Sequence, residues 1–299
     1  MERQALSSTF DKIVVTMYAE SQLHVGKGMD IGIVDLPIQR ERTTGFPIIQ
    51  GIKGSLRANI NFGGKEKEIF GSEPSESSSN DSNKGTTPGQ IAFSEAKILL
   101  FPVREHERLF VWVTCPLALI RFFKELGKHD IVEKLEKLNI TDADVFTHNK
   151  ENKTEIMLED FKFTLKEDKE FGRIGEIISK NISTVDYIKE KIKKDILIVN
   201  DKTFAAIVET MTEIIPRIRI NKTTGTVDQG ALWYEEYLPQ DTIMYFVARR
   251  TLFSNTKNEE NQKDLMEVLK SKIDGTVINV GGKETVGKGL VSLKVVSLQ

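Results

Sequence analysis

Cysteine is almost missing from this chain, because Cys115 is the single one among 299 residues. An intrachain disulfide is therefore impossible, and no Cys/His spacing typical of a zinc site exists. Long apolar runs are missing as well, since the longest, LFVWVTCPLALI, is short and is interrupted by Pro116. The N-terminal residues MERQALSSTF lack the pattern of a signal peptide. We therefore expect a cytoplasmic protein without a membrane span.

An excess of positive charge is also missing. The chain has 42 Lys and Arg against 44 Asp and Glu, which gives a net charge of −2. A free basic tail is thereby excluded as the basis of nucleic-acid binding, so any phosphate contact must come from a local patch on a neutral body. The length suits one large domain or two small ones, and no internal repeat is visible.

Local patterns predict an α+β fold. Alternating β-branched residues predict a strand at 12–18, and the spacing of Ile52, Leu56 and Ile60 predicts a helix over 52–62. Further strands are expected in ILLFPV, LFVWVT, ILIVN, TIMYFVARRTLF, TVINVG and VSLKVVS, and further helices in ALIRFFKELGK and KDLMEVLKSKI. Strands separated by single helices favour a ferredoxin-like or RRM-like palm with long loop insertions.

Three segments elaborate this palm within one domain spanning 1–299. Residues 72–90 are rich in Ser, Asn and Gly and predict a flexible loop. Residues 128–200 predict a mostly helical insertion with a strand near MLEDFKFTL. PRIRIN and ALWYEEYL flank NKTTGTVDQG, which predicts a β-hairpin at 216–240 with turn chemistry around Thr224-Gly225 and Gln229-Gly230.

The C-terminal segment GGKETVGKG fits the G-x-x-x-x-G-K part of a nucleotide-binding P-loop from Gly282 to Lys288. The next residue should be Ser or Thr, but it is Gly289, and a strand pattern follows where the motif requires a helix. Nucleotide hydrolysis is therefore a poor interpretation. The glycines still allow backbone N–H groups to approach a phosphate, although a tight turn with exposed lysines is the simpler interpretation of this segment alone.

The N-terminal segment strengthens the case for phosphate binding. Residues 24–47 predict a long loop, and the cations in and just after it are Lys27, Arg40, Arg42, Lys53 and Arg57. Gly51 and Gly54 flank a predicted helix start, where free N–H groups and the helix dipole favour an anion. Each charge alone is typical of a solvated surface. Together with the C-terminal segment they predict a protein that binds phosphate groups, in which Lys53 and Arg57 can follow a sugar–phosphate backbone.

Several motifs resemble a known family when they are taken in order. They are LHVGKG, GIVDLPIQRERTTGFPIIQG, KGSLR, IFG followed by a variable loop and GQIAFSEAKILLFPV, RIRINKTTGTVDQGALWYEEYLP, and GGKETVGKGLV. This order resembles the repeated backbone subunit of type III-B (Cmr) CRISPR effector complexes, a member of the RAMP superfamily. The resemblance leaves 128–200 unmatched, and QGIKGSLR is shorter here than the family's usual glycine–serine turn.

The resemblance implies a subunit that stacks with copies of itself into a helical filament along a CRISPR guide RNA, beside the other Cmr subunits. The palm would hold the guide backbone. The hairpin, or thumb, would push between nucleotides so that single-stranded target RNA is cut beside it at regular intervals. The implied RNA-binding residues are Lys27, Arg40, Arg42, Lys53, Arg57, Arg217, Arg219, Trp233, Lys283 and Lys288.

The same resemblance places the cleavage residue at Asp35 and neighbouring active-site positions at His24, Glu235 and Tyr237. Attack of a 2′-hydroxyl on the adjacent phosphorus needs in-line geometry, removal of a proton and stabilisation of negative charge. An aspartate is a weak base at neutral pH, so we expect Asp35 to hold a weakly bound Mg²⁺ or Mn²⁺ whose water acts as the base.

Two other functions stay open from the sequence. One is a non-catalytic, structural RNA-binding subunit of the same filament, and the other is an isolated RNA-binding protein outside any CRISPR complex. Single residues also have plainer explanations: Asp35 before Leu-Pro is typical of a loop cap, and His24 could merely order the loop. Strand alternation places Trp233, Glu235 and Tyr237 on one face, where some could form hairpin core.

Overall fold

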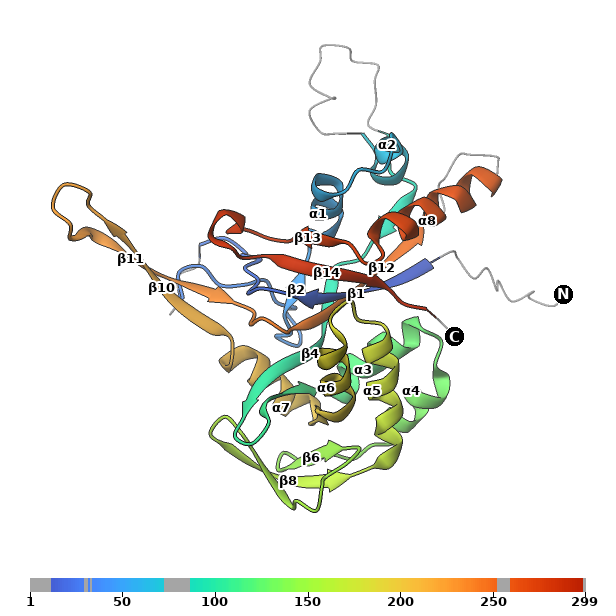
Figure 1. The fold of residues 1–299 in the computed structure, drawn as a ribbon, viewed down its shortest axis with the longest axis vertical. Helices are drawn as coiled ribbons and strands as arrows, with labels where there is room; N and C mark the ends of the chain where they lie inside the picture. The colour runs from blue at the N-terminus through green and yellow to red at the C-terminus, as the bar shows by residue number, and fades with distance from the viewer. Residues whose placement is uncertain (1–11, 30–31, 33, 73–86, 252–258, 298–299) are drawn as a thin grey trace, which may run out of the picture.

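Four antiparallel strands form the centre of the structure, in the spatial order β14-β1-β12-β4. The structure is a computed structural model that describes residues 12–29, 32, 34–72, 87–251 and 259–297 (Figure 1). Helices α1 and α8 lie in the two crossover connections, which gives a βαββαβ path. The bounds are β1 Lys12–Ala19, α1 Ile52–Asn59, β4 Ala96–Glu105, β12 Ile243–Arg250, α8 Glu259–Ile273 and β14 Leu290–Val295. The predicted α+β class is thereby confirmed.

Helices cover both faces of these central strands. Alternate residues of β1 point to opposite faces, so Val15 and Met17 join the apolar cluster that contains Leu56 of α1 and Leu269 of α8. Val14 and Tyr18 join the second cluster, in which Phe122 belongs to α3. An RRM stacks RNA bases on an open sheet face. Here helices pack on both faces, so the central strands present no open sheet face of that kind.

The second half of the sheet turns back on itself. From β4 the order continues β5-β9-β6-β8-β7, and β7 pairs again with β4 through Leu158 and Glu105. The strands of this half are β5 Leu109–Thr114, β6 Asp144–Thr147, β7 Glu155–Leu158, β8 Phe161–Glu167 and β9 Ile196–Ile198. Its helices are α3 Pro116–Glu125, α4 His129–Glu136, α5 Gly172–Lys180, α6 Asp186–Lys194 and α7 Asp201–Thr210, with the 3₁₀ turn η2 at Lys169–Phe171.

The prediction that 128–200 is mostly helical is therefore wrong. Four of the strands, β6 to β9, lie in this segment and belong to the sheet, and β9 is the strand expected in ILIVN. The single strand expected near MLEDFKFTL is two strands, because Glu159 has a φ of +49° and makes a tight turn between β7 and β8. Charged side chains on the solvent face of these strands resemble those of a solvated helix, which explains the error.

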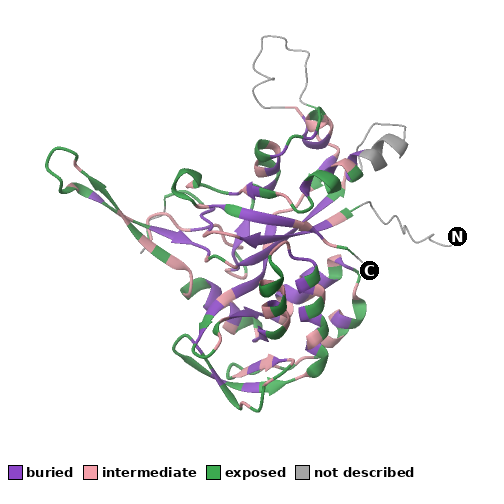
Figure 2. Cartoon of the chain, in the orientation of Figure 1, coloured by how far each residue is buried: buried purple, intermediate pink, exposed green. Residues whose placement is uncertain are grey.

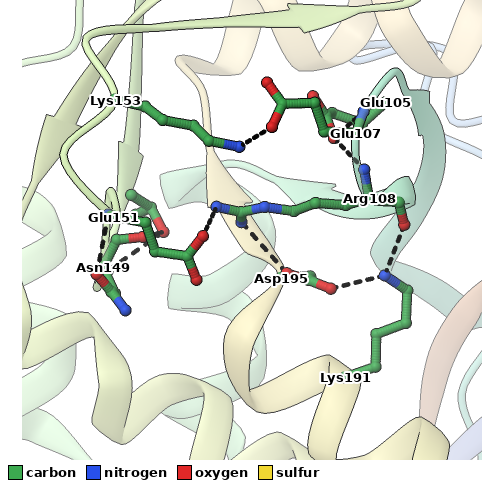
Figure 3. A network of polar contacts seen from close by, with 9 residues as sticks. Glu105, Glu107, Arg108, Asn149, Glu151, Lys153, Lys191 and Asp195 are labelled. Atoms are coloured by element: carbon green, nitrogen blue, oxygen red, sulfur yellow. Dashed lines mark hydrogen bonds and ion pairs between the residues drawn. The ribbon is translucent and has the colours of Figure 1, made fainter.

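A polar network closes this half beside the β4–β5 turn (Figure 3). Arg108 donates to Asp195 Oδ1 (3.2 Å) and Glu151 Oε2 (3.5 Å), so it links that turn to α6 and to the loop before β7. Lys191 donates to Asp195 Oδ2 (2.6 Å) and to the Arg108 carbonyl (3.1 Å). The side chains of Arg108, Asp195 and Lys191 are mostly buried, whereas that of Glu151 is exposed. The network therefore holds the β4–β5 turn against the end of α6.

The predicted hairpin exists and projects far from the body (Figure 1). Its strands are β10 Glu213–Ile220 and β11 Val227–Tyr237, and the turn lies at Thr224-Gly225 as expected. The second expected turn, at Gln229-Gly230, is wrong. Gly230 has a φ of +72° inside β11, where the pairing with β10 shifts register, so this glycine permits a bulge. The outer part of the hairpin is exposed (Figure 2).

Smaller elements complete the description. The helix predicted over 52–62 ends at Asn59, because Ile60 is already extended, and α2 Glu66–Phe70 follows. Short strands are β2 Ile48–Ile49, β3 Ile91–Phe93 and β13 Val277–Asn279, and η3 is a 3₁₀ turn at Glu284–Val286. Most of the loop predicted at 72–90 lies outside the described residues. In the described part of the chain, no helix is long and apolar enough to cross a membrane.

The two ends of that loop lie close together at Gly71 and Thr87, and this contact generates a first prediction. Gly71 has φ +86° and ψ −179°, a region accessible almost only to glycine, and a Cβ there would lie 2.5 Å from the Thr87 carbonyl oxygen. Gly71→Ala should lower the free energy of unfolding by about 2–4 kcal/mol in urea titrations. Gly63→Ala is the control, because Gly63 also has a positive φ (+68°) but an added Cβ meets no atom within 4 Å. Equal losses in the two variants would contradict the close approach at Gly71.

Candidate functional site

The two glycine-rich segments lie side by side. Gly282 N donates to the His24 carbonyl (2.9 Å), and Gly289 N donates to the Gln22 carbonyl (2.9 Å). Gly281 sits at this junction with a φ of +83°, and a Cβ on it would lie 2.4 Å from the His24 carbonyl oxygen. The close approach of two backbones therefore requires glycine. Segments almost 260 residues apart in the sequence thus form one surface.

The C-terminal segment is a turn and not the start of a helix. Lys283 and Gly287 both adopt the left-handed conformation on either side of η3, and strand β14 follows at Leu290. The P-loop geometry, with a helix N-terminus facing phosphate, is therefore not formed. The turn directs Lys283 toward the base of the hairpin, where its Nζ donates to Glu235 Oε1 (2.5 Å).

Glu235 is the centre of a buried polar cluster. It is 1% exposed and accepts hydrogen bonds from Lys283, from Trp233 Nε1 (2.8 Å), from Arg217 Nε (3.2 Å) and from the Tyr237 hydroxyl. Burial alone would raise the pKa of Glu235, but the hydrogen bonds from Lys283, Tyr237 and Trp233 and the charge of Lys283 outweigh it and lower the pKa to about 2. Glu235 is therefore an ionised anchor and a poor proton donor at neutral pH.

His24 and Tyr237 pack beside this anchor, with ring centroids 5.3 Å apart. His24 Nδ1 lies 2.8 Å from the Glu236 carbonyl oxygen, which can only accept, so Nδ1 carries a hydrogen and Nε2 is the nitrogen left for proton exchange. A Cβ on Gly26 would lie 2.9 Å from Nε2, so glycine is needed there too. Burial raises the pKa of Tyr237, and Lys288 Nζ lies 5.4 Å from its ring centre.

Asp35 lies along the outer edge of β11. Leu36 bridges Glu235 in parallel, Leu36 N donates to the Tyr234 carbonyl (3.1 Å), and Glu236 N donates to the Leu36 carbonyl (3.0 Å). Asp35 Oδ2 accepts a hydrogen bond from Tyr234 N (2.7 Å). The carboxylate therefore sits at the hairpin base with one oxygen fixed by the backbone. The second oxygen, Oδ1, is the one that a ligand would meet.

Glu236 holds the long N-terminal loop in place from the opposite face of β11. It is 5% exposed and accepts hydrogen bonds from Ile38 N (2.9 Å), Thr212 Oγ1 (2.8 Å) and the Arg40 guanidinium. Arg40 also donates to the carbonyls of Gly45 (3.0 Å) and Val208 (2.9 Å). Arg40 is one of the predicted RNA-binding residues, but it donates its hydrogen bonds within the protein. These bonds position the loop that carries Asp35.

The other predicted RNA-binding cations lie on the surface around this centre. Lys27, Arg42 and Lys53 are exposed. Arg57 is half-buried, and its Nη2 donates to the Gly71 carbonyl (2.7 Å), which ties α1 to α2. Arg219 is exposed on the outer hairpin and pairs with Asp228 (3.1 Å). The structure therefore gathers Arg217, Trp233, Lys283 and Lys288 at the hairpin base and distributes the remaining cations along α1, the loop and the hairpin.

A preformed metal centre is not evident in the part of the chain that the structure describes. No group of three or more His, Cys, Asp or Glu side chains there could hold an ion. Glu235 has its oxygens occupied by Lys283, Arg217, Trp233 and Tyr237. Asp35 Oδ1 is a suitable hard donor for Mg²⁺ or Mn²⁺, so the protein would supply one carboxylate and the remaining ligands would be water or RNA oxygens.

The sequence interpretation missed Glu236 and Gln22. Gln22 accepts from Lys288 Nζ and donates to Glu213, and its carbonyl holds Gly289. Two consecutive glutamates in a strand face opposite sides, so the predicted strand over ALWYEEYL already placed Glu236 on the face opposite Glu235. Gln22 gives no signal in the sequence, since its role depends on contacts with distant segments.

Comparisons with known proteins identify the family of the chain. The sequence model of the RAMP superfamily matches residues 16–292. A Pyrococcus furiosus protein named CRISPR system Cmr endoribonuclease Cmr4 is 37% identical over 290 residues, which is 94% of this chain and 94% of that protein. The crystal structure of oligomeric Cmr4 from Pyrococcus furiosus has a TM-score of 0.70 at 28% identity, covering 96% of this chain and 99% of that one. A type III-B Cmr-beta structure in the apo state, with a TM-score of 0.71 at 21% identity over 96% of this chain and 97% of that one, supports the fold alone.

The junction of the glycine-rich segments generates the second prediction. Gly281→Ala should push the C-terminal turn away from His24 and lower the free energy of unfolding by about 2–3 kcal/mol. Gly282→Ala is a matched control, because its Cβ would meet nothing closer than 4.0 Å. Hydrogen exchange of residues 280–290 measures the local effect, and it should quicken only in Gly281→Ala. Unchanged exchange in that variant would contradict the tight junction.

The ionised Glu235 generates the third prediction. Its pKa in the folded chain is about 2, below the ordinary 4.5, so the charged form stabilises the fold above pH 4.5 and this contribution disappears as the pH falls toward 2. Glu235→Gln should therefore lower stability by roughly 1–3 kcal/mol at pH 7, and by less at pH 3. Denaturant unfolding at both values checks this, with exposed Glu133→Gln as control. A loss that does not depend on pH would contradict the ionised anchor.

Proposed function

The chain belongs to the RAMP superfamily, and on that premise we propose that it is the guide-RNA-binding backbone subunit of a type III-B (Cmr) CRISPR effector, cleaving guide-paired target RNA at regular intervals. The near full-length similarity to a protein named as a Cmr endoribonuclease supports the activity. The observation that carries the proposal is the position of Asp35, fixed at the base of a projecting hairpin beside a cluster of cations.

The hairpin explains why cleavage would occur at intervals. It extends well beyond the body of the protein (Figure 1) and so would separate successive nucleotides of the RNA duplex in each subunit of a filament. A displaced nucleotide leaves the A-form stack, which frees its 2′-oxygen to align with the adjacent phosphorus. One cut per subunit follows, beside each hairpin base. The similarity to an oligomeric Cmr4 supports the assembly of such copies.

The chemistry is transfer of a phosphoryl group within the RNA. The 2′-oxygen forms a bond to phosphorus as the bond to the 5′-oxygen breaks, which leaves a 2′,3′-cyclic phosphate and a free 5′-hydroxyl. Asp35 would accept the proton of the 2′-hydroxyl, directly or through a water, and His24 Nε2 would supply a proton to the 5′-oxygen as its bond to phosphorus breaks. The cations Lys283, Lys288 and Arg217 would stabilise the negative charge that develops on the phosphate oxygens. Glu235 keeps these cations in place.

A divalent cation belongs to this proposal as a weakly held partner of Asp35. When bound, Mg²⁺ or Mn²⁺ would supply a water of lowered pKa and positive charge near the phosphate. Asp35 Oδ1 is the protein ligand we assign to it. Guide RNA, target RNA, further copies of the chain and other Cmr subunits are the proposed partners, and the cytoplasm is the proposed location.

A second candidate is a structural subunit that does not cut. The hydrogen bond between Asp35 Oδ2 and Tyr234 N favours it, because this is what a loop cap would form. The two functions differ in what the charge of Asp35 does. A cap needs an acceptor oxygen, whereas cleavage needs a carboxylate.

Asp35→Asn separates the candidates, and it is the fourth prediction. Asparagine keeps an acceptor for Tyr234 N but removes the charge. In the reconstituted complex with guide RNA and Mg²⁺ or Mn²⁺, the variant should assemble normally while single-turnover cleavage falls by about 10²–10⁴-fold. Asp160→Asn, an exposed charge at the β7–β8 turn, is the control and should cleave at the parental rate. Assembly lost together with cleavage would instead favour the structural role of Asp35.

A further inference from the structure

A separate basic cleft lies on the other side of the molecule's central sheet from α1 and α8. It has a volume of about 350 Å³ and is lined by residues of β4, β12 and α3 and by Ser94. The charged and hydroxyl-bearing residues of its lining are Ser94, Lys97, Arg121, Lys124, Glu125, Tyr245 and Arg249. None of these residues belongs to the hairpin-base cluster, so the cleft needs an explanation of its own.

The regular geometry of the fold builds this cleft. Lys97 of β4 lies directly opposite Tyr245 of β12, so both side chains point to the same face of the sheet. Arg249 is four residues after Tyr245 and shares that face, because strand side chains alternate. On α3, Arg121 is half-buried and Lys124 is exposed, and both line the cleft, while the apolar side chains of the helix face the core. The cations therefore converge from two rigid elements and not from a loop.

The charges of the cleft do not cancel. Glu125 is shared by Lys12 (3.0 Å) and Arg249 (2.5 Å), and Arg121 holds Glu41 through two bonds of 2.9 and 3.0 Å. Lys97 and Lys124 have no acidic partner among the described residues. Lys97 and Lys124 thus stand outside these ion pairs and Glu125 serves two cations, so the cleft has an excess of positive charge that an anion would neutralise.

Tyr245 adds a directed hydrogen-bond donor. Its side chain is 2% exposed and its ring packs edge-on against Phe122, with centroids 5.0 Å apart. The hydroxyl borders the cleft and has no hydrogen-bond partner among the described residues. Burial raises the pKa of Tyr245, so the phenol stays protonated and can donate. Solvent reaches the hydroxyl oxygen, so the hydroxyl can donate its hydrogen to water or to an anion in the cleft.

We propose that this cleft binds a phosphate group, with Lys97 and Lys124 supplying charge, Arg249 or Arg121 forming paired hydrogen bonds, and the Tyr245 hydroxyl donating from the floor. Lysine and arginine around a confined oxyanion are the usual chemistry of phosphate recognition. The volume accommodates one phosphate with an attached nucleoside and not a duplex. The phosphate group belongs either to a small phosphorylated molecule or to a nucleotide of single-stranded RNA.

Site-resolved lysine acylation tests the proposal on the full-length chain. An amine-reactive ester labels each lysine, and peptide mass spectrometry gives its rate without a probe and with adenosine 5′-monophosphate, tripolyphosphate or a tetranucleotide RNA. Lys97 and Lys124 should be protected at least about threefold by one or more probes. Protection by the mononucleotide or tripolyphosphate indicates a small-molecule source, and protection by the RNA alone indicates an RNA source. Both outcomes support the site.

Two controls make the result decisive. Lys137 and Lys194 are exposed lysines of other helices, and their rates should not change. Tyr245→Phe keeps the ring packing and should keep the melting temperature within about 2 °C, but it should lose at least half of the protection. No protection with any probe, equal protection of all four lysines, or full protection in folded Tyr245→Phe would each overturn the proposal.

Discussion

Two consecutive buried glutamates on one strand organise the candidate site. Side chains of a strand alternate, so Glu235 and Glu236 of β11 face opposite sides while both are almost fully buried. A buried carboxylate must be surrounded by donors, and no single segment can supply enough of them. Glu235 takes its donors from the hairpin and from Lys283 of the C-terminal turn. Glu236 takes them from Thr212 and from the long N-terminal loop. Three segments distant in sequence are thereby brought to the hairpin base.

Because of this constraint, the cations near the site are of two kinds. A cation that satisfies a buried carboxylate is fixed in position but has part of its charge neutralised, as for Arg40, Arg217 and Lys283. Exposed cations such as Lys53 and Arg42 keep their charge but are less precisely placed. The first kind suits a reaction centre, where position matters. The second suits binding to an RNA backbone, which is tolerant of position and sensitive to salt.

Local features of the fold could be predicted from the sequence, and long-range ones could not. Strand β1, the hairpin with its turn at Gly225, and the strand after GGKETVGKG follow from periodicity and turn chemistry. The contact of Gly282 with His24 brings the two glycine-rich segments together, and the sequence patterns alone did not predict this contact. The bulge at Gly230, the internal role of Arg40 and the strand β6 depend on partners far along the chain. No local pattern encodes those partners, so the errors fell there.

The proposed chemistry requires Asp35 to meet the scissile position of the target RNA at each hairpin base. A structure of the assembled complex, bound to a target with 2′-deoxy nucleotides at the cleavage positions, measures this directly. We predict that Asp35 Oδ1 lies within about 4 Å of the place that the 2′-oxygen would occupy, or within reach of it through one water or ion, with the phosphate in line. A scissile phosphate held beyond about 8 Å from Asp35, with the hairpin still inserted between nucleotides, would contradict this role.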